Sequence, residues 1–398
     1  MFSRFSICQA RTDYTRRVYS RAAVFPIIVG LTMSVNSTKA ALYQSSDWAV
    51  VGKVGGSVGY DSNLTASAGG PGDGFATFEP GVIVKRYDSD SKFEFSGGLV
   101  GTTFFDGRSP SQIDVDTSVD YAYPYNDEQL PRLTGYARFH RSTIADPTVG
   151  KRITSEVYTL TSGGRVYSSG KWGIDASLSY NRTQYAASIF NTSQDGELTL
   201  SLAFNPSPVT EYSINVVSGV GDTVPTIVGN DRVNNIEEEI TFKAQTDLAS
   251  KTTGSLFVGA EMARFRGDYR RTELIPVAGG EVIWNVTQRG YIKAAPSIGV
   301  DYTPDGEVRD ITKLTLIYHQ TIFGAWAWEV SSGPEWRSYH QDVHTRSDRD
   351  ITIGSSIDYQ PSDRFTVSFS YTGTFQGSSV DYANFNRHLT YFSTEYHF

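Results

Sequence analysis

The stretch that decides the fold is the end of the sequence, FNRHLTYFSTEYHF, from Phe385 to Phe398. Side chains alternate across a β-strand, so Phe392, Tyr396 and Phe398 would share one face. An apolar face that ends on an aromatic residue is typical of the closing strand of a bacterial outer-membrane barrel, and we expect these three aromatics to act as the assembly signal. Two threonines dilute the face, and an ordinary amphipathic strand of a soluble protein is the alternative.

The same period of two recurs along the rest of the sequence. Residues 365–372 read FTVSFSYT and residues 198–204 read LTLSLAF, so that apolar residues alternate with small, mostly polar ones. Such alternation also occurs in soluble sandwiches. Many of these segments, however, extend for roughly 10 to 14 residues, which suits a tilted transmembrane strand better than a soluble strand of about 5 to 6. The pattern therefore favours a transmembrane barrel.

The first forty residues have the order of a secretory signal peptide. Arginines precede an apolar run from Ala22 to Val35, and small residues follow it up to Ala40. The run is too short to span a bilayer as a helix, and cleavage after Ala40 fits the pattern. We therefore divide the chain into a signal peptide, residues 1–40, and a barrel, residues 41–398. Cys8 is the only cysteine and lies ahead of the apolar run, so it is no lipoprotein anchor.

Charge and composition exclude several classes of protein. Residues 1–40 hold six of the 35 basic and one of the 43 acidic residues, so 29 basic and 42 acidic residues remain, a net charge of −13. No later segment approaches about 20 consecutive apolar residues, which argues against a helical membrane protein. No basic stripe suggests nucleic-acid binding.

Turn- and loop-forming residues divide the chain into eighteen strand-like segments between Trp48 and Phe398. The predicted fold is all-β: one transmembrane, antiparallel, up-and-down barrel. Sixteen strands are the alternative, because Met262 to Gln288 is ambiguous. An even number leaves both ends of the chain in the periplasm. Two breaks, Asp222–Asn235 and Phe265–Gly280, predict external loops long enough to constrict the mouth.

Two segments resemble a known family. Gly59–Leu64 reads GYDSNL, similar to a signature near the mature start of the putative β-barrel porin 2 family, and Gln194–Thr210 is similar to that family's middle. The family includes EpsL-type barrels encoded with exopolysaccharide genes. The resemblance therefore implies passive export of exopolysaccharide across the outer membrane, together with separate periplasmic export proteins. It supplies no catalytic residues.

The strand alternation also predicts which side chains face the barrel lumen. The candidate lumen-lining residues are charged and lie between the lipid-facing positions. They are Lys92, Asp114, Asp116, Asp120, Arg138, Asp175, Glu211, Glu239, Lys243, Lys293, Lys313 and Glu329. Acidic residues outnumber basic ones, which would disfavour anions within about 8 Å, the Debye length at physiological salt. The alternative is a polar, internally paired interior without such a role.

Other functions find less support in the sequence. A few outer-membrane barrels hydrolyse lipids, but no spacing of His319, His388 or His397 identifies a nucleophile with its base. We predict no enzyme activity, cofactor or metal site. The main hypothesis is a monomeric export channel of a Gram-negative outer membrane whose partners are lipid and the barrel assembly machinery. A generic small-solute porin or a structural barrel is the alternative, and a lipid hydrolase a remote one.

Overall fold

The structure is a computed structural model that describes residues 42–88, 90–124, 132–146, 151–186, 192–224, 233–266, 271–302, 308–340 and 346–398. Almost all of these residues lie in β-strands, and one short 3₁₀ turn, η1, spans Asp381–Ala383. No helix in the described ranges is long and apolar enough to cross a membrane. Residues 1–41 lie outside these ranges, so the signal peptide and its cleavage after Ala40 stay predictions.

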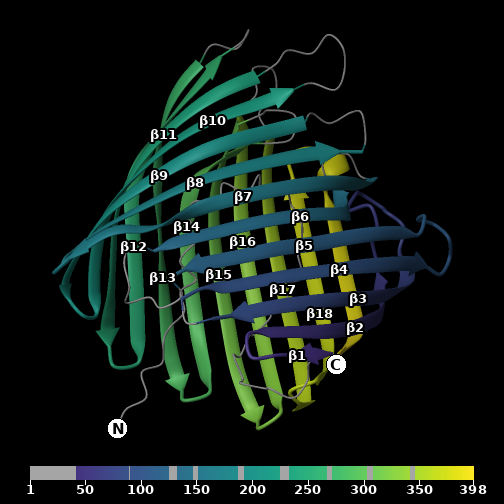
Figure 1. Ribbon diagram of the computed structural model, residues 1–398. Coiled ribbons are helices and arrows are strands. Elements are labelled where there is room, and N and C mark those ends of the chain that lie inside the picture. The colour runs from purple at the N-terminus through teal and green to yellow at the C-terminus, as the bar shows by residue number, and fades with distance from the viewer. Residues whose placement is uncertain are drawn as a thin grey trace.

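The strands form one antiparallel sheet that closes on itself (Figure 1). Their bounds are β1 (Tyr43–Gln44), β2 (Trp48–Asp61), β3 (Asp73–Tyr87), β4 (Lys92–Phe104), β5 (Gln112–Tyr123), β6 (Leu133–Asp146), β7 (Lys151–Ser169), β8 (Trp172–Tyr185), β9 (Thr192–Ser207), β10 (Thr210–Val224), β11 (Val233–Ala249), β12 (Thr252–Arg266), β13 (Arg271–Thr287), β14 (Gly290–Tyr302), β15 (Val308–Phe323), β16 (Trp326–His340), β17 (Arg346–Ser362), β18 (Phe365–Ser378) and β19 (Phe385–His397).

Closure joins the last strand to the first long one. β19 pairs with β2 from Leu389↔Asp61 to His397↔Lys53, and Phe398 and Gly52 exchange backbone hydrogen bonds of 2.9 Å. The two-residue β1 only adds to the edge of β2, so β2–β19 make a barrel of eighteen strands. In Figure 1 the strands of the front wall cross those of the back wall, as the strand tilt of a closed barrel requires. The predicted fold and strand number are confirmed.

The predicted break from Phe265 to Gly280 contains the connection between β12 and β13 but is too long. β12 continues to Arg266, and β13 begins at Arg271 and pairs with β12 throughout its first ten residues. Pro276 and Gly280 look like loop residues, but each is paired with β12 only, and a strand that is bonded on one side tolerates them. The second predicted loop is also shorter than expected, because β10 extends to Val224 and β11 begins at Val233.

The two ends of the barrel differ in their connections. At the end where β2 begins and β19 finishes, here called the turn end, the connections are short, such as 170–171 and 208–209. At the opposite end, the loop end, the connection between β2 and β3 runs from 62 to 72. Short turns at the end where the first long strand begins and the last strand finishes match the periplasmic end of outer-membrane barrels.

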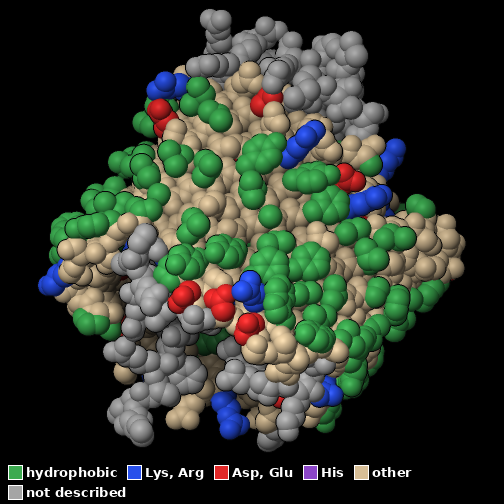
Figure 2. Space-filling model, viewed as in Figure 1, with side chains coloured by type: hydrophobic (Ala, Val, Ile, Leu, Met, Phe, Trp, Pro, Cys, Tyr) green, Lys and Arg blue, Asp and Glu red, His purple; other side chains and the backbone are tan. Residues whose placement is uncertain are grey.

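Strand alternation separates an apolar outer face from a polar inner face. On β9, Leu198, Leu200 and Leu202 are each more than 40% exposed, and the residues between them are Thr199 and Ser201. Hydrophobic side chains cover much of the face shown in Figure 2, and charged side chains there are few. Because a closed barrel has no second sheet to cover its outside, an apolar outer face suits contact with lipid.

Prolines interrupt the strand pairing at defined places. Pro80 on β3 falls where the β3–β4 pairing skips from Phe78↔Gly101 to Gly81↔Gly98. Pro334 on β16 falls in the same kind of gap with β15. A proline has no N–H to donate, so each one removes a cross-strand hydrogen bond on one side of its strand.

Candidate functional site: the barrel interior

The strand register places all twelve candidate lumen-lining residues at inner positions. They occupy the alternate positions to the exposed apolar side chains on the same strands, and cross-strand partners share a face. For example, Asp116 lies opposite His140, Asp120 opposite Tyr136, and Glu239 opposite Glu261. Whether these side chains line a water-filled passage stays a prediction.

Three of the candidates take part in bidentate ion pairs between neighbouring strands. Arg138 donates from Nε to Asp116 Oδ1 (2.8 Å) and from Nη2 to Oδ2 (2.6 Å). Arg165 donates in the same way to the two carboxylate oxygens of Asp175, at 3.0 Å each. The Asp116 side chain is 47% exposed and Arg138 is 32% exposed, although both point into the barrel. Solvent therefore reaches this part of the interior.

Other candidates also meet charged or polar neighbours. Lys92 Nζ lies 3.7 Å from Glu94 Oε2, Lys293 pairs with Glu281, and Glu329 Oε2 lies 3.7 Å from His319 Nδ1. Asp114 accepts a hydrogen bond from Gln112. The remaining three are placed by the register, with Glu211 opposite Gln245, Lys243 opposite Phe257 and Lys313 opposite Glu335.

Acidic residues gather on one arc of the inner wall, the strands β9–β12. At the inner positions that the structure describes on these four strands, Lys243 is the one lysine or arginine. The acidic residues at those positions are Asp195, Glu197, Glu211, Glu237, Glu239, Asp247 and Glu261. On the arc β5–β8, by contrast, arginines accompany the aspartates.

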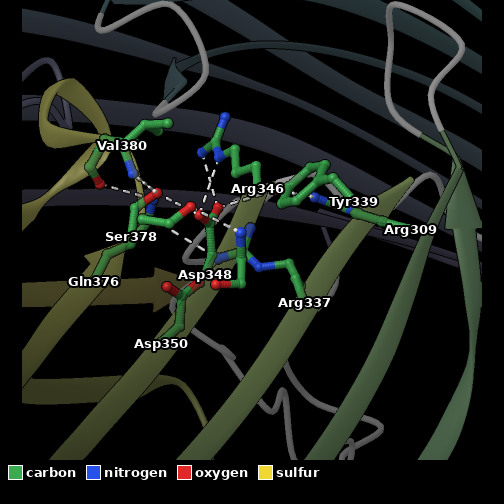
Figure 3. A network of polar contacts seen from close by, with 12 residues as sticks. Arg309, Arg337, Tyr339, Arg346, Asp348, Asp350, Gln376, Ser378 and Val380 are labelled. Carbon is green, nitrogen blue, oxygen red and sulfur yellow. Dashed lines mark hydrogen bonds and ion pairs between the residues drawn. The ribbon is translucent and has the colours of Figure 1, made fainter. Parts of the chain in front are cut away.

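A second group of charges is buried at the loop end, on β15–β18 (Figure 3). Asp348, only 1% exposed, accepts hydrogen bonds from Arg346 Nε (3.0 Å) and Nη2 (2.8 Å), from the Tyr339 hydroxyl (3.1 Å) and from Ser378 Oγ (2.6 Å). Arg309 donates to the same tyrosine oxygen at 3.2 Å. The carboxylate of Asp348 therefore accepts hydrogen bonds from β16, β17 and β18, and these protein donors replace water around it.

Arg337 extends this group toward the centre of the wall. It is 2% exposed, pairs with Asp350, and its Nε lies 3.4 Å from Glu335 Oε1. Its Nη2 donates to Gln376, which in turn donates to the Ala383 carbonyl at 2.9 Å. The network therefore connects β16 and β17 to the segment that joins β18 and β19.

The β2–β3 connection folds into the same end of the barrel. Asp61 accepts three hydrogen bonds of 2.6–3.1 Å from Arg387 on β19, and the Asn63 side chain donates to the Asn386 carbonyl at 3.2 Å. Leu64 and Ala66 are almost fully buried, and Ala66 clusters with Ala145 of β6 and Phe385 of β19. Because β2–β5 separate those two strands along the wall, the connection must cross the inside of the mouth.

Sequence reasoning missed this loop-end group. Tyr339 and Asp348 lie near the ends of β16 and β17, which run to His340 and start at Arg346. The GYDSNL segment was quoted only for its family resemblance, although it holds the Asp61 and Asn63 anchors. The arginines and aspartates near strand ends were the only sign of this group in the sequence. Which of them pair with each other depends on the register between strands, which the sequence does not give.

Two of the candidate histidines have polar partners near the carboxyl-terminal strand. His388 Nδ1 lies 2.9 Å from the Tyr371 hydroxyl, and His397 Nε2 lies 2.6 Å from Glu395 Oε1. Within the described ranges, no group of three or more His, Cys, Asp and Glu residues is placed to hold a metal ion.

Phe392, Tyr396 and Phe398 are 41–46% exposed on the outer face, where an assembly signal would be accessible. Their role in assembly stays a prediction.

Comparison with known proteins identifies the fold. The structure of OccAB3 from Acinetobacter baumannii is similar, with a TM-score of 0.51 and 7% identity over 89% of this chain and 100% of that one. OccAB4 from the same organism gives a TM-score of 0.51 and 7% identity over 89% and 99%. The outer membrane protein opdK of Pseudomonas aeruginosa gives 0.50 and 8% over 88% and 98%. No protein-family model and no curated protein matches, so the resemblance to the porin 2 family stays a prediction.

Proposed function

We propose that the protein is a passive diffusion channel of a bacterial outer membrane that accepts small hydrophilic solutes and prefers cations and neutral molecules to anions. The observation that carries this proposal is the polar inner wall inside an apolar barrel. Charged side chains such as those of Asp116 and Arg138 point inward and stay a third to a half exposed. Water that reaches such groups can also carry solutes.

The acidic arc on β9–β12 supports the preference for cations. Fixed charges on a pore wall attract ions of opposite sign within about 8 Å at physiological salt, the Debye length. Glu211 and Glu239 lie on this arc, and Lys243 is the one basic residue at its described inner positions. An anion that follows this side of the wall would meet repulsion along most of its path.

Reversal potentials across planar bilayers test this function. Purified protein in a potassium chloride gradient should give a potential of the sign expected for cation transfer, and Glu239→Gln should move it toward zero. The matched control is Glu238→Gln. Glu238 immediately precedes Glu239 in the sequence but faces outward, where its Oε2 lies 3.3 Å from Arg264 Nη2. Absence of ion conduction by correctly folded protein would contradict the proposal, and equal shifts for both variants would contradict the role of the arc.

Export of exopolysaccharide is the second candidate and depends on the resemblance of Gly59–Leu64 and Gln194–Thr210 to that family. Deletion of the gene, followed by measurement of secreted, surface-attached and periplasmic polysaccharide, separates the two functions. Loss of secreted glycan, restored by an intact copy, would favour export. Unchanged glycan together with conduction in bilayers would favour the small-solute channel.

A further inference from the structure

The outer face of the barrel carries arginines where its apolar band ends toward the loop end. On β8 the outer positions from Trp172 to Tyr180 are apolar, and Arg182 comes next and is exposed. Strands rise about 3.3 Å per residue and tilt by about 40°, so the ten residues from Trp172 to Arg182 climb about 25 Å, the height of the apolar band in outer-membrane barrels. Since the turn end matches the periplasmic end, Arg182 lies level with the lipid headgroups of the external leaflet.

A second arginine, Arg141 on β6, reaches the same level from the other side of β7. It is exposed and lies opposite Glu156 of β7, whereas Arg182 lies opposite Tyr158, two residues nearer the turn end. With neighbouring strands about 4.8 Å apart, this register puts the Cα atoms of Arg141 and Arg182 roughly 12 Å from each other. Two extended side chains can therefore reach one group placed between them. We call Arg141 and Arg182 the outer arginine pair.

The outer arginine pair is not neutralised by ion pairs within the part of the chain that the structure describes. There Arg141 has no side-chain partner, and Arg182 lies against the side-chain amide of Gln184 but pairs with no carboxylate. Arg264 on β12 also faces outward near the loop end, but its Nη2 lies 3.3 Å from Glu238 Oε2. The outer arginine pair therefore has charge available for a group outside the protein.

Aromatic rings and one carboxylate surround the outer arginine pair. The rings of Phe139 and Tyr158 pack with their centroids 5.0 Å apart, on the bilayer side of the pair. Glu156 lies between the two arginines, and its Oε2 accepts a hydrogen bond from the Tyr158 hydroxyl at 3.3 Å. Figure 2 shows basic and acidic side chains next to hydrophobic ones at the right-hand ends of β6–β8. Two guanidinium groups against one carboxylate leave a net positive charge here.

The chemistry of the pair and the wall below it indicates the ligand. A guanidinium group presents paired N–H donors that match the oxygens of a phosphate, and it stays charged at any ordinary pH. Below the pair, Leu160 on β7 and Leu178 on β8 are 56% and 60% exposed on the same outer face. A free phosphate ion would use only the arginines, whereas a phosphorylated lipid would also place its acyl chains against these leucines.

We propose that the outer arginine pair binds a phosphate group of a phosphorylated lipid in the external leaflet, with the acyl chains of that lipid against the apolar wall of β6–β8. Basic side chains at the level of anionic headgroups attract such lipids. Because Glu156 lies between the two arginines, the phosphate sits on the side of the guanidinium groups that faces away from this carboxylate. The inference depends on the membrane location but not on conduction, so a barrel that conducts no ions would contradict the proposed function and leave this site standing.

Native mass spectrometry of the purified barrel in detergent, with bis-phosphorylated lipid A added, tests the site by counting barrels that retain the lipid. Arg141→Gln with Arg182→Gln should weaken binding about 25-fold, because each arginine near anionic headgroups contributes about a factor of five. Lipid A from which both phosphates have been removed should bind the wild type and this double variant equally. Equal retention of bis-phosphorylated lipid A by the wild type and the double variant would overturn the proposal.

The matched control is Arg86→Gln with Arg264→Gln. It removes the same charge from outer positions whose arginines already have carboxylate partners, Asp88 at 3.4 Å and Glu238 at 3.3 Å. Lipid A should bind this variant as it binds the wild type, and equal weakening in the two double variants would show a general effect of charge and contradict the site. All four arginines are on the outer surface, and the gel mobility of unheated samples checks that each variant is a folded barrel.

Two further measurements locate the site and identify the source of the phosphate. Glu156→Gln removes the carboxylate between the arginines and should strengthen binding of lipid A, whereas unchanged or weaker binding would place the phosphate elsewhere. Inorganic phosphate at the same concentration as lipid A should not displace the lipid, because it makes no contact with the apolar wall. Displacement by inorganic phosphate, but not by chloride, would assign the arginines to the free ion and overturn the lipid site.

Discussion

Charges on the inner wall differ in their exposure to solvent between its middle and the loop end. Near the middle, Asp116 and Arg138 form an ion pair that remains a third to a half exposed. Toward the loop end, Asp348 and Arg337 are 1% and 2% exposed and are held by hydrogen bonds from several strands. The first arrangement leaves charge available to passing solutes. The second uses charge to fix the strands and the mouth in place.

The largest effect on stability is expected at Asp348. Replacement by Ala removes the acceptor of four hydrogen bonds and leaves the buried Arg346 without that partner. Breaking one half of a buried pair costs about 3–5 kcal/mol. Urea unfolding in detergent micelles, followed by tryptophan fluorescence, measures this loss. A loss as small as that of an exposed pair would show that the loop-end group is not sealed from water.

Asp61→Asn should have the next largest effect, and mainly on permeation. The carboxylate that Arg387 binds through three hydrogen bonds anchors the β2–β3 connection inside the mouth. We expect a loss of about 1–3 kcal/mol, because a charged partner is left incompletely satisfied. Single-channel conductance should rise, because residues 62–72 lose an anchor. Unchanged conductance in this variant would mean that the connection does not narrow the passage.

Asp116→Asn breaks an exposed pair and should change stability by less than about 1 kcal/mol. The same substitution removes a negative charge from the solvent-exposed inner wall, so chloride permeability should increase. Urea unfolding measures the change in stability and reversal potentials measure the chloride permeability, both on the same preparation. A loss of stability close to that of Asp348→Ala would remove the distinction between the middle of the wall and the loop end.

The sequence was sufficient for the features that depend on alternation. The predicted breaks gave the correct number of strands because each strand needs a lipid-facing residue at every second position, a pattern that neighbouring residues carry. The break at Phe265–Gly280 was too long because Pro276 and Gly280 give the same signal in a loop and in a strand that is paired on one side only. The loop-end network could not be predicted from the sequence, because the contact between Arg337 and Gln376 depends on the registers of β16, β17 and β18.

The smallest effect is expected outside the barrel wall, in the turn between β3 and β4. Ser91 Oγ donates to Asp88 at 2.8 Å, and the backbone N–H groups of Asp90 and Ser91 donate to the same carboxylate. These bonds, the Ser91 hydroxyl first, hold the pKa of Asp88 below its ordinary value. A carboxyl group whose folded pKa is lowered stabilises the protein above its unfolded pKa, and this stabilisation is lost as the pH falls through the folded pKa.

Asp88→Asn should therefore leave a small deficit in urea stability near pH 7 that shrinks toward zero below the ordinary carboxyl pKa. The comparison is wild type against variant at both pH values, with Asp348→Ala measured alongside to give the scale of a buried carboxylate. Because the Asp88 donors all come from its own turn, its loss should leave conductance unchanged. A change in conductance would mean that this turn is coupled to the passage, and the turn end would then also help to control permeation.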